Sequence, residues 1–186
     1  PRRPHPHSGT PSRRMMRHLT PSDYTTMAWA NGKGSTIEML RVEAEGRLKW
    51  RLSRASVVEN GAFSLFPGIE RNLTVLTGPG FDLVGDGLHL PARPLVPVEF
   101  PGDVAVRAEG VSAPSDDFNV MTARALPRPE VAVVTGRVHL PQGGLLALYA
   151  LGASVVNDHS MAAQDLILTE DAARVEGHTL VVRLFG

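Results

Sequence analysis

Residues 72–90 read NLTVLTGPGFDLVGDGLHL, and this stretch decides the fold class. Two runs of apolar and β-branched residues, 72–77 and 81–84, are separated by Gly-Pro-Gly. The pair Asp86-Gly87 then lies between two such runs, where we expect a tight hairpin turn with positive φ at both positions. Short runs bounded by turn residues are typical of strands rather than helices.

The same spacing continues along the rest of the chain. Glycine (18) and proline (15) interrupt the sequence at short intervals, and the segments between them are apolar or alternating. This pattern predicts an all-β sandwich or barrel with little helix. The run 145–151 has a composition that suits a helix, but the glycines on both sides favour a strand. The other expected strands are 36–43, 48–57, 95–99, 104–108, 118–122, 131–134, 165–169 and 179–185.

A weak internal repeat suggests that two barrels follow one another. Residues 74–78 (TVLTG) and 148–152 (LYALG) each open a similar series of strands separated by glycines and turns. The similarity is one of pattern rather than identity. A chain of 186 residues is long enough for two small halves that share a core.

The charges are distributed unevenly, although the formal net charge is zero. The first 22 residues contain five arginines and no acid, which leaves 14 basic and 19 acidic residues, a net charge of −5, in the remainder. We expect residues 1–18, basic and rich in proline, to form a flexible N-terminal extension, and residues 19–186 to form the folded part. An acidic body disfavours nucleic acid as a partner.

Several classes of protein and site are disfavoured by composition. The longest apolar run, 145–150, is much shorter than the roughly 20 residues of a membrane helix. No secretory signal pattern is present, so we expect a cytoplasmic protein without a membrane partner. Cysteine is absent, which excludes disulfides and thiolate metal sites. The only closely spaced histidines, His5 and His7, lie in the extension, so no metal site is expected.

The stretch 29–36, WANGKGST, has the composition of a phosphate-binding loop but not its pattern. With Gly32-Lys33 as the Gly-Lys pair, the Walker sequence would need a glycine at Met27 and a hydroxyl residue at Gly34. The following residues also read as a strand instead of the required helix. The stretch is therefore interpreted as a glycine turn that leads into an edge strand.

Polar side chains stand out on three of the expected strands. Alternation places Arg51 and Ser53 on one face of 48–57, and Asp117 with Asn119 on one face of the strand around 118–122. Arg71 begins the strand that follows a Pro-Gly turn. These residues are either the polar outer faces of ordinary strands or the lining of a binding site.

Residues 27–124 resemble the HutD/Ves family. The resemblance is carried, in order, by WANGKGSTIEML, KWRLSRASVVENGAFSLFPGIERNLTVLTGPG, VPVEFPGDVAV and SDDFNVM. It implies a cupin-like double β-barrel, a bicupin of the RmlC-like jelly-roll type, without the cupin metal ligands or another cofactor. The opening motif departs from the family, because Ala30 stands at the usual basic position and Lys33 replaces the middle glycine.

The resemblance also implies a function in histidine utilisation. We expect a non-enzymatic protein that binds a small anionic metabolite, such as urocanate or a formylglutamate-like acid, and modulates the pathway; a homodimer is a candidate assembly. Arginine suits a carboxylate, amide and hydroxyl groups fix orientation, and aromatic rings form a wall. The candidate ligand-binding residues are Trp29, Asn31, Glu38, Arg51, Ser53, Phe66, Arg71 and Asn119.

Two other functions remain open at this point. A metal-free cupin isomerase or hydrolase of similar small acids would need a general base, for which Glu38, Asp117 and His89 are the candidates. A structural or stress-related interaction protein with an empty barrel would bind no metabolite at all.

Overall fold

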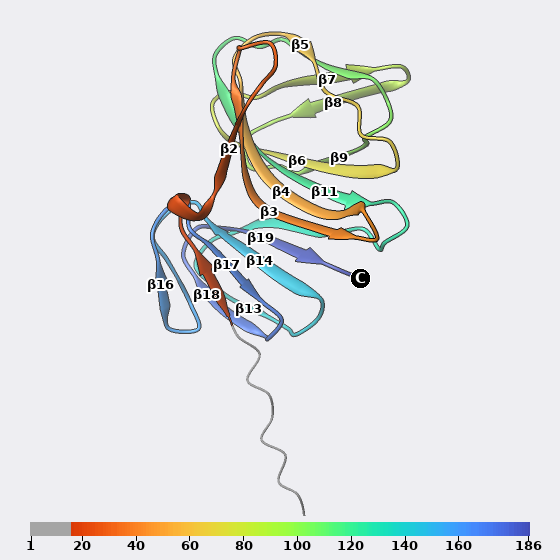
Figure 1. Cartoon of the computed structure of the whole chain (residues 1–186). Coiled ribbons are helices and arrows are strands. Elements are labelled where there is room, and N and C mark those ends of the chain that lie inside the picture. Colours follow the sequence, from red (N-terminus) through yellow and green to blue (C-terminus); the bar gives the residue numbers. More distant parts are fainter. Residues whose placement is uncertain (1–15) are drawn as a thin grey trace, which may run out of the picture.

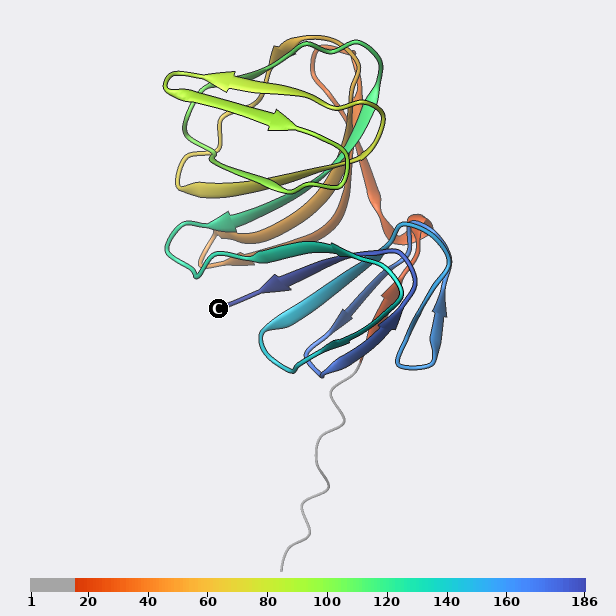
Figure 2. The same cartoon turned by 180° about the vertical axis from the view of Figure 1, so that it is seen from behind.

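The protein is built almost entirely from antiparallel strands. The computed structural model describes residues 16–186, and within them nineteen strands and one short 3₁₀ turn, η1 (Pro21–Asp23), are present. Figures 1 and 2 show two stacked bodies, one coloured mainly orange to green and the other mainly blue. We refer to them as the N-terminal and C-terminal barrels. The all-β double barrel predicted from the sequence is confirmed.

The N-terminal barrel is made of a six-stranded and a four-stranded sheet. The larger sheet has the order β2 (Thr25–Ala28), β3 (Ser35–Ala44), β4 (Arg47–Val57), β11 (Ser115–Ala123), β6 (Ile69–Thr77), β9 (Val98–Pro101). The smaller sheet has the order β5 (Gly61–Ala62), β10 (Val106–Glu109), β7 (Phe81–Gly85), β8 (Leu88–Ala92).

The C-terminal barrel repeats this plan with five and four strands. Its larger sheet has the order β1 (Arg17–Leu19), β17 (Leu166–Thr169), β14 (Leu145–Ala150), β19 (Thr179–Leu184), β12 (Glu130–Val134). Its smaller sheet has the order β13 (Arg137–Leu140), β18 (Ala173–Glu176), β15 (Ser154–Val156), β16 (His159–Met161). The first strand of the described chain therefore belongs to the second barrel, and β2 crosses to the first one (Figure 1).

Three apolar cores stabilise the fold, one inside each barrel and one between the barrels. One core fills the N-terminal barrel around Leu73 and Phe81, and a second fills the C-terminal barrel around Leu148 and Val175. The third core lies between the barrels, where Leu52 of β4 and Leu180 of β19 are both fully buried. The partner-facing sides of both large sheets are mainly apolar, and on the inner face of the first large sheet buried polar residues lie beside the core of the N-terminal barrel.

Several sequence expectations need correction. Only Gly87 of the Asp86-Gly87 turn has a positive φ, +67°, because glycine alone supplies the left-handed residue there. The run 95–99 is a strand only from Val98, since Leu95 has a φ of +64°. The expected extension over 1–18 ends earlier than predicted, because Arg17–Leu19 pairs with β17. Residues 1–15 lie outside the described part of the chain.

No membrane-spanning helix is present among residues 16–186, where none is long and apolar enough to cross a bilayer.

Candidate functional site

The register of three neighbouring strands builds the floor of a cavity inside the N-terminal barrel. Strand β11 lies between β4 and β6, and cross-strand partners share a face of the sheet. Arg51 and Arg71 both pair with Met121, so their Cα atoms lie two strand spacings, about 10 Å, apart. The inward rows are Arg51–Met121–Arg71, Ser53–Asn119–Leu73 and Ala55–Asp117–Val75.

The cavity has a volume of about 420 Å³ and is walled by two further segments. The β2–β3 loop covers one side and the chain around β5 covers the other. The first side is lined by Trp29, Ala30 and Asn31 of the loop together with Thr36 at the start of β3, and the second by Ala62, Phe63, Ser64 and Phe66.

Arg71 is the most unusual group in the cavity. It is only 7% exposed, and the rings of Phe63, Phe66 and Phe100 lie 5.4, 5.2 and 5.0 Å from its guanidinium carbon. Its Nη2 donates to Oδ1 of Asn119 (2.8 Å), but its buried Nε has no hydrogen-bond partner among the described residues. Burial lowers its pKa to about 10, so it remains a cation at neutral pH.

The side-chain amide of Asn119 forms hydrogen bonds to both Asp117 and Arg71. Asn119 Nδ2 donates to Asp117 Oδ1 at 2.5 Å, and the same side chain accepts from Arg71. Burial raises the pKa of Asp117 to about 7, although the charge of Arg71 and the bond from Asn119 oppose this shift. The carboxyl group therefore changes its protonation state near neutral pH.

Arg51 is already paired, in contrast to Arg71. Its Nε donates to Oε1 of Glu38 at 2.7 Å, and the same oxygen accepts from Nη1 of Arg41 at 3.3 Å. Glu38 itself does not line the cavity, and it is held between two arginines beside the floor. Its ion pair with Arg51 compensates the charge of one of the two cavity arginines.

The β2–β3 loop fixes Trp29 at the mouth of the cavity. The indole Nε1 donates to Oγ1 of Thr36 at 2.9 Å, and the loop closes through a backbone bond from Trp29 to Gly34 of 2.9 Å. A Cβ on Gly34 would lie 2.9 Å from the Trp29 ring, so only glycine allows this close contact.

The lysine of this loop points away from the cavity. Lys33 Nζ lies 2.9 Å from Oε1 of Glu59 in the β4–β5 loop, and both side chains are more than half exposed. Its backbone N–H donates to Oδ1 of Asn31 at 2.9 Å, which shapes the turn. Lys33 therefore links two loops at the mouth and does not line the cavity.

Most of the residues predicted for the site converge there. Seven line the cavity, namely Trp29, Asn31, Arg51, Ser53, Phe66, Arg71 and Asn119. The eighth, Glu38, contacts Arg51 from outside the lining. Asp117, expected only as a base for an enzyme, also lines the cavity, and the ligand-site prediction missed Phe63 and Met121. Met121 shares the inward face of β11 with Asn119, which is the signal that would have found it, whereas Phe63 lies in the loop after β5, where strand alternation gives no signal.

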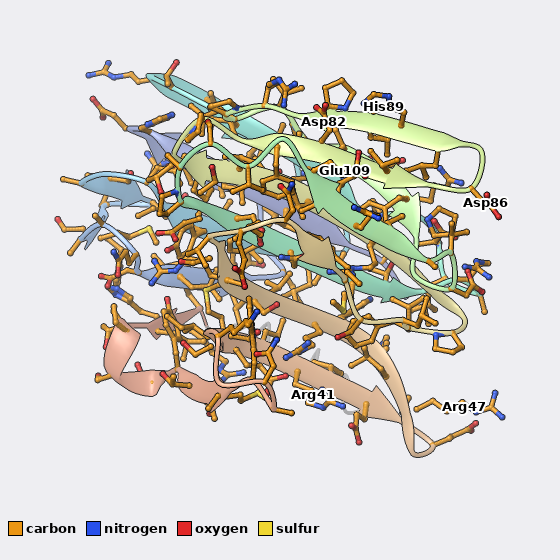
Figure 3. The ribbon with its side chains drawn as sticks, turned by 90° about the horizontal axis from the view of Figure 1, so that it is seen from above. Arg41, Arg47, Asp82, Asp86, His89 and Glu109 are labelled. Carbon is orange, nitrogen blue, oxygen red and sulfur yellow. The ribbon has the colours of Figure 1, made fainter. Side chains whose placement is uncertain are left out.

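His89 is placed away from the site. It is exposed on β8, where Nε2 lies 3.3 Å from Oδ2 of Asp82. Figure 3 shows both side chains on the outer hairpin, far across the molecule from Arg41. The prediction of His89 as a base for this site is therefore wrong, because strand alternation does not tell which sheet a histidine belongs to.

Within residues 16–186, no group of three or more histidine, cysteine, aspartate or glutamate side chains is arranged to hold a metal ion. The pair His5 and His7 lies outside the described residues.

Comparison with known proteins gives consistent results. The HutD family model matches residues 21–183. The chain is 35% identical to an uncharacterised 21.2 kDa protein in the hutC 3′ region of Pseudomonas putida, with 86% of each chain covered. It is 36% identical to the protein Ves of Cronobacter sakazakii, over 70% of this chain and 74% of that one.

A solved structure shows the same fold. The structure of HutD from Pseudomonas fluorescens SBW25, described as a formate condition, superposes with a TM-score of 0.84 at 27% identity. The match covers 91% of this chain and 98% of that one.

Proposed function

The chain belongs to the HutD family, and from this premise we propose that it binds a small carboxylate metabolite in the cavity of the N-terminal barrel. Binding of this metabolite would report the state of histidine utilisation and modulate the pathway. The hutC-region relative supports the link to this pathway, and the cavity supports the chemistry.

The observation that carries the proposal is the unpaired Nε of Arg71. A buried guanidinium N–H without an acceptor costs free energy, and a carboxylate is the acceptor that fits its planar fork. Stacking of three aromatic rings around the same guanidinium fixes its orientation before any ligand arrives. The site is thus preorganised for an anion at Arg71.

The charges favour a ligand with one carboxylate over a ligand with two. Arg51 and Glu38 compensate each other, which leaves Arg71 as the uncompensated cation whenever Asp117 is protonated. A urocanate-like monoanion would place its carboxylate on Arg71 and its flat ring near the aromatic wall. A formylglutamate-like dianion would have to share Arg51 with Glu38.

The test is calorimetric titration of the folded protein with urocanate and with formylglutamate. We expect urocanate to bind and Arg71→Ala to abolish binding, because the carboxylate loses its partner. Arg51→Ala should weaken binding as well, since it leaves Glu38 without its closer partner beside the cavity. Arg107→Ala, at an exposed arginine of β10 outside the cavity, is the matched control. Unchanged affinity in a folded Arg71→Ala variant would refute the assignment.

An enzymatic role is the second candidate, and Asp117 is the observation that favours it. A carboxyl group with a pKa of about 7, buried in a cavity, is suited to accept and return a proton at neutral pH. The test is to follow both acids by NMR in the presence of the protein. Turnover that disappears in Asp117→Asn while binding persists would establish catalysis, and intact acids after long incubation would leave binding as the function.

A further inference from the structure

A second cavity lies on the opposite face of the same sheet, at the edge of the core between the barrels. Its volume is about 190 Å³, the share of roughly six water molecules in the liquid. Leu76 and Leu151 line the cavity and are partly buried against the core between the barrels. The lining of this cavity includes Arg54, Leu95, Asp116, Tyr149, Gln164 and His178.

Strand alternation separates the two cavities. On β4, Ser53 faces the first cavity and Arg54 faces the second. On β11, Asp117 faces the first and Asp116 the second. The pairing of β11 with β6 is irregular between these two aspartates, and such bulges re-aim side chains next to binding sites.

The second cavity presents a cation and an anion that do not pair with each other. Arg54 donates through Nη1 to the hydroxyl of Tyr149 at 2.9 Å, and Asp116 accepts from the hydroxyl of Ser56. Among the described residues, no ion pair joins Arg54 to Asp116. Arg54 thus retains free donors on Nε and Nη2, and the second oxygen of Asp116 retains acceptor capacity.

The backbone at this cavity is strained on both sides. Leu95 and Gln164 have φ values of +64° and +75°, a conformation that costs energy for residues with a side chain. Both segments are tied down by hydrogen bonds, from Leu95 N to Val75 O (2.8 Å) and from Gln164 N to Ala150 O (2.8 Å). Strained backbone of this kind clusters at active sites and ligand clamps.

We propose that this second cavity binds a small zwitterion of the α-amino acid class. The carboxylate would pair with the free donors of Arg54, and the ammonium group would pair with Asp116. Tyr149 holds the guanidinium in place, and Gln164 and His178 face the remaining space, where a short side chain fits. The site is spatially distinct from the anion site, because its charged groups lie on the other face of β4 and β11.

The test is NMR titration of the isotopically labelled full chain with alanine, and in parallel with acetate and with methylamine. Alanine should shift resonances around the second cavity, and each half-molecule should bind at least about tenfold more weakly, because it satisfies one charge only. Acetate that bound as tightly as alanine would show a simple anion site and overturn the proposal. The absence of shifts with any common α-amino acid at millimolar concentration would overturn it too.

Substitutions at Arg54 and Asp116 test whether alanine binds in the second cavity. Asp116→Asn and Arg54→Gln should each reduce alanine affinity by about tenfold or more while the far-ultraviolet circular dichroism stays unchanged. Arg54→Lys keeps the charge without the fork and should give an intermediate loss. Arg107→Ala, at the exposed arginine of β10 outside both cavities, is the matched control and should leave alanine binding intact. Full affinity in the folded Asp116→Asn and Arg54→Gln proteins would refute the assignment.

Discussion

At the scale of single residues, the site is dominated by a chain of three polar side chains. Arg71, Asn119 and Asp117 are buried in series, and the amide between the charges donates to one and accepts from the other. This series holds Arg71 in position for an anion. It also makes the pKa of Asp117 depend on its burial, on the charge of Arg71 and on the hydrogen bond from Asn119. Burial of the Asp117 carboxyl group also lowers the free energy of unfolding at a pH where this group is ionised.

The first prediction concerns this cost. Because the folded-state pKa of Asp117 is raised from 3.8 to about 7, the folded protein holds this proton more tightly than the unfolded chain. Its contribution to stability is complete below about pH 4 and is lost as the pH rises to about 7. Asp117→Asn should therefore raise the free energy of unfolding at pH 8 by roughly 1–3 kcal/mol.

The measurement is urea denaturation of both proteins at pH 5 and pH 8. The gain of Asp117→Asn should be smaller at pH 5, where the native carboxyl is mostly protonated. Asp103→Asn is a useful comparison, because Arg124 holds the pKa of that exposed carboxyl below its usual range. Asp103 is therefore ionised in the folded and the unfolded state at both pH values, and the effect of its replacement should not differ between pH 5 and pH 8. A gain for Asp117→Asn that is equal at both pH values would contradict the shift.

The second prediction concerns the contact between Gly34 and Trp29. Gly34→Ala places a Cβ about 2.9 Å from the indole ring, so the ring must move away from the cavity mouth. We expect a changed fluorescence spectrum and a severalfold loss of urocanate affinity, with little change in the melting temperature. Gly32→Ala is the control, because φ is +71° there but no atom lies within 4 Å of the new Cβ. Equal effects of both variants on affinity would argue against a specific role of the ring.

At single residues, the face of a strand on which a side chain lies can be predicted from the sequence, whereas its burial and its partners on other strands cannot. Alternation along a strand predicts which residues of that strand share a face, so Arg51 is expected beside Ser53, and Asp117 beside Asn119. The register that joins these two faces in one cavity comes from strand pairing, which alternation does not give. Glu38 was placed in the cavity, but the pairing of β3 with β4 is irregular just after it, which no residue pattern revealed. Burial depth is also invisible locally, so Asp117 was recognised only as a possible base.

At the scale of elements, the cavity is a product of non-local pairing. The floor needs β11 to insert between β4 and β6, and the nearer of these strands in sequence is more than thirty residues away. The apolar or alternating segments between glycines and prolines predicted these strands, including β14, whose composition also suits a helix. The pairing order could not be predicted from the runs, and neither could the membership of β1 in the second barrel.

The third prediction concerns the two loops at the cavity mouth. Lys33 and Glu59 connect them through an exposed ion pair, and such pairs contribute about 0.2–1 kcal/mol. Lys33→Glu should therefore accelerate ligand release by up to about fivefold, because the loops then repel each other. Exchanging both charges, with Lys33→Glu and Glu59→Lys together, should restore the original rate. Stopped-flow fluorescence at low salt measures this, and a release rate that ignores both variants would exclude a linking role.

At the scale of the whole molecule, the two barrels share one apolar interface. Leu52 and Phe118 from the first large sheet pack with Tyr149 and Leu180 from the second, and all are buried. The cavities lie on the two sides of β4 and β11, so the interface also fixes the geometry of both sites. We therefore expect the barrels to fold as one cooperative unit.

The fourth prediction tests this cooperativity. Leu52→Ala removes a fully buried side chain between the barrels and should destabilise the protein by about 2–5 kcal/mol. Fluorescence reports on Trp29 at the cavity mouth and on Trp50 in the core between the barrels, and it should give the same midpoint in denaturant as circular dichroism. Leu65→Ala, at a side chain that is 55% exposed, should change stability by less than about 0.5 kcal/mol. Separate transitions for the two probes would show that the barrels fold independently.

The neighbouring aspartates on β11 have one more consequence. Burial is the main cause of the raised pKa of Asp117, and the negative charge of the adjacent Asp116 adds a smaller contribution. A molecule that neutralises Asp116 would ease the ionisation of Asp117 and so weaken the hold on an anion beside it. By thermodynamic reciprocity, that anion would weaken the other molecule's binding by the same factor. Binding at the two cavities would then be negatively coupled through the charges of two adjacent residues of β11, without any movement of the backbone.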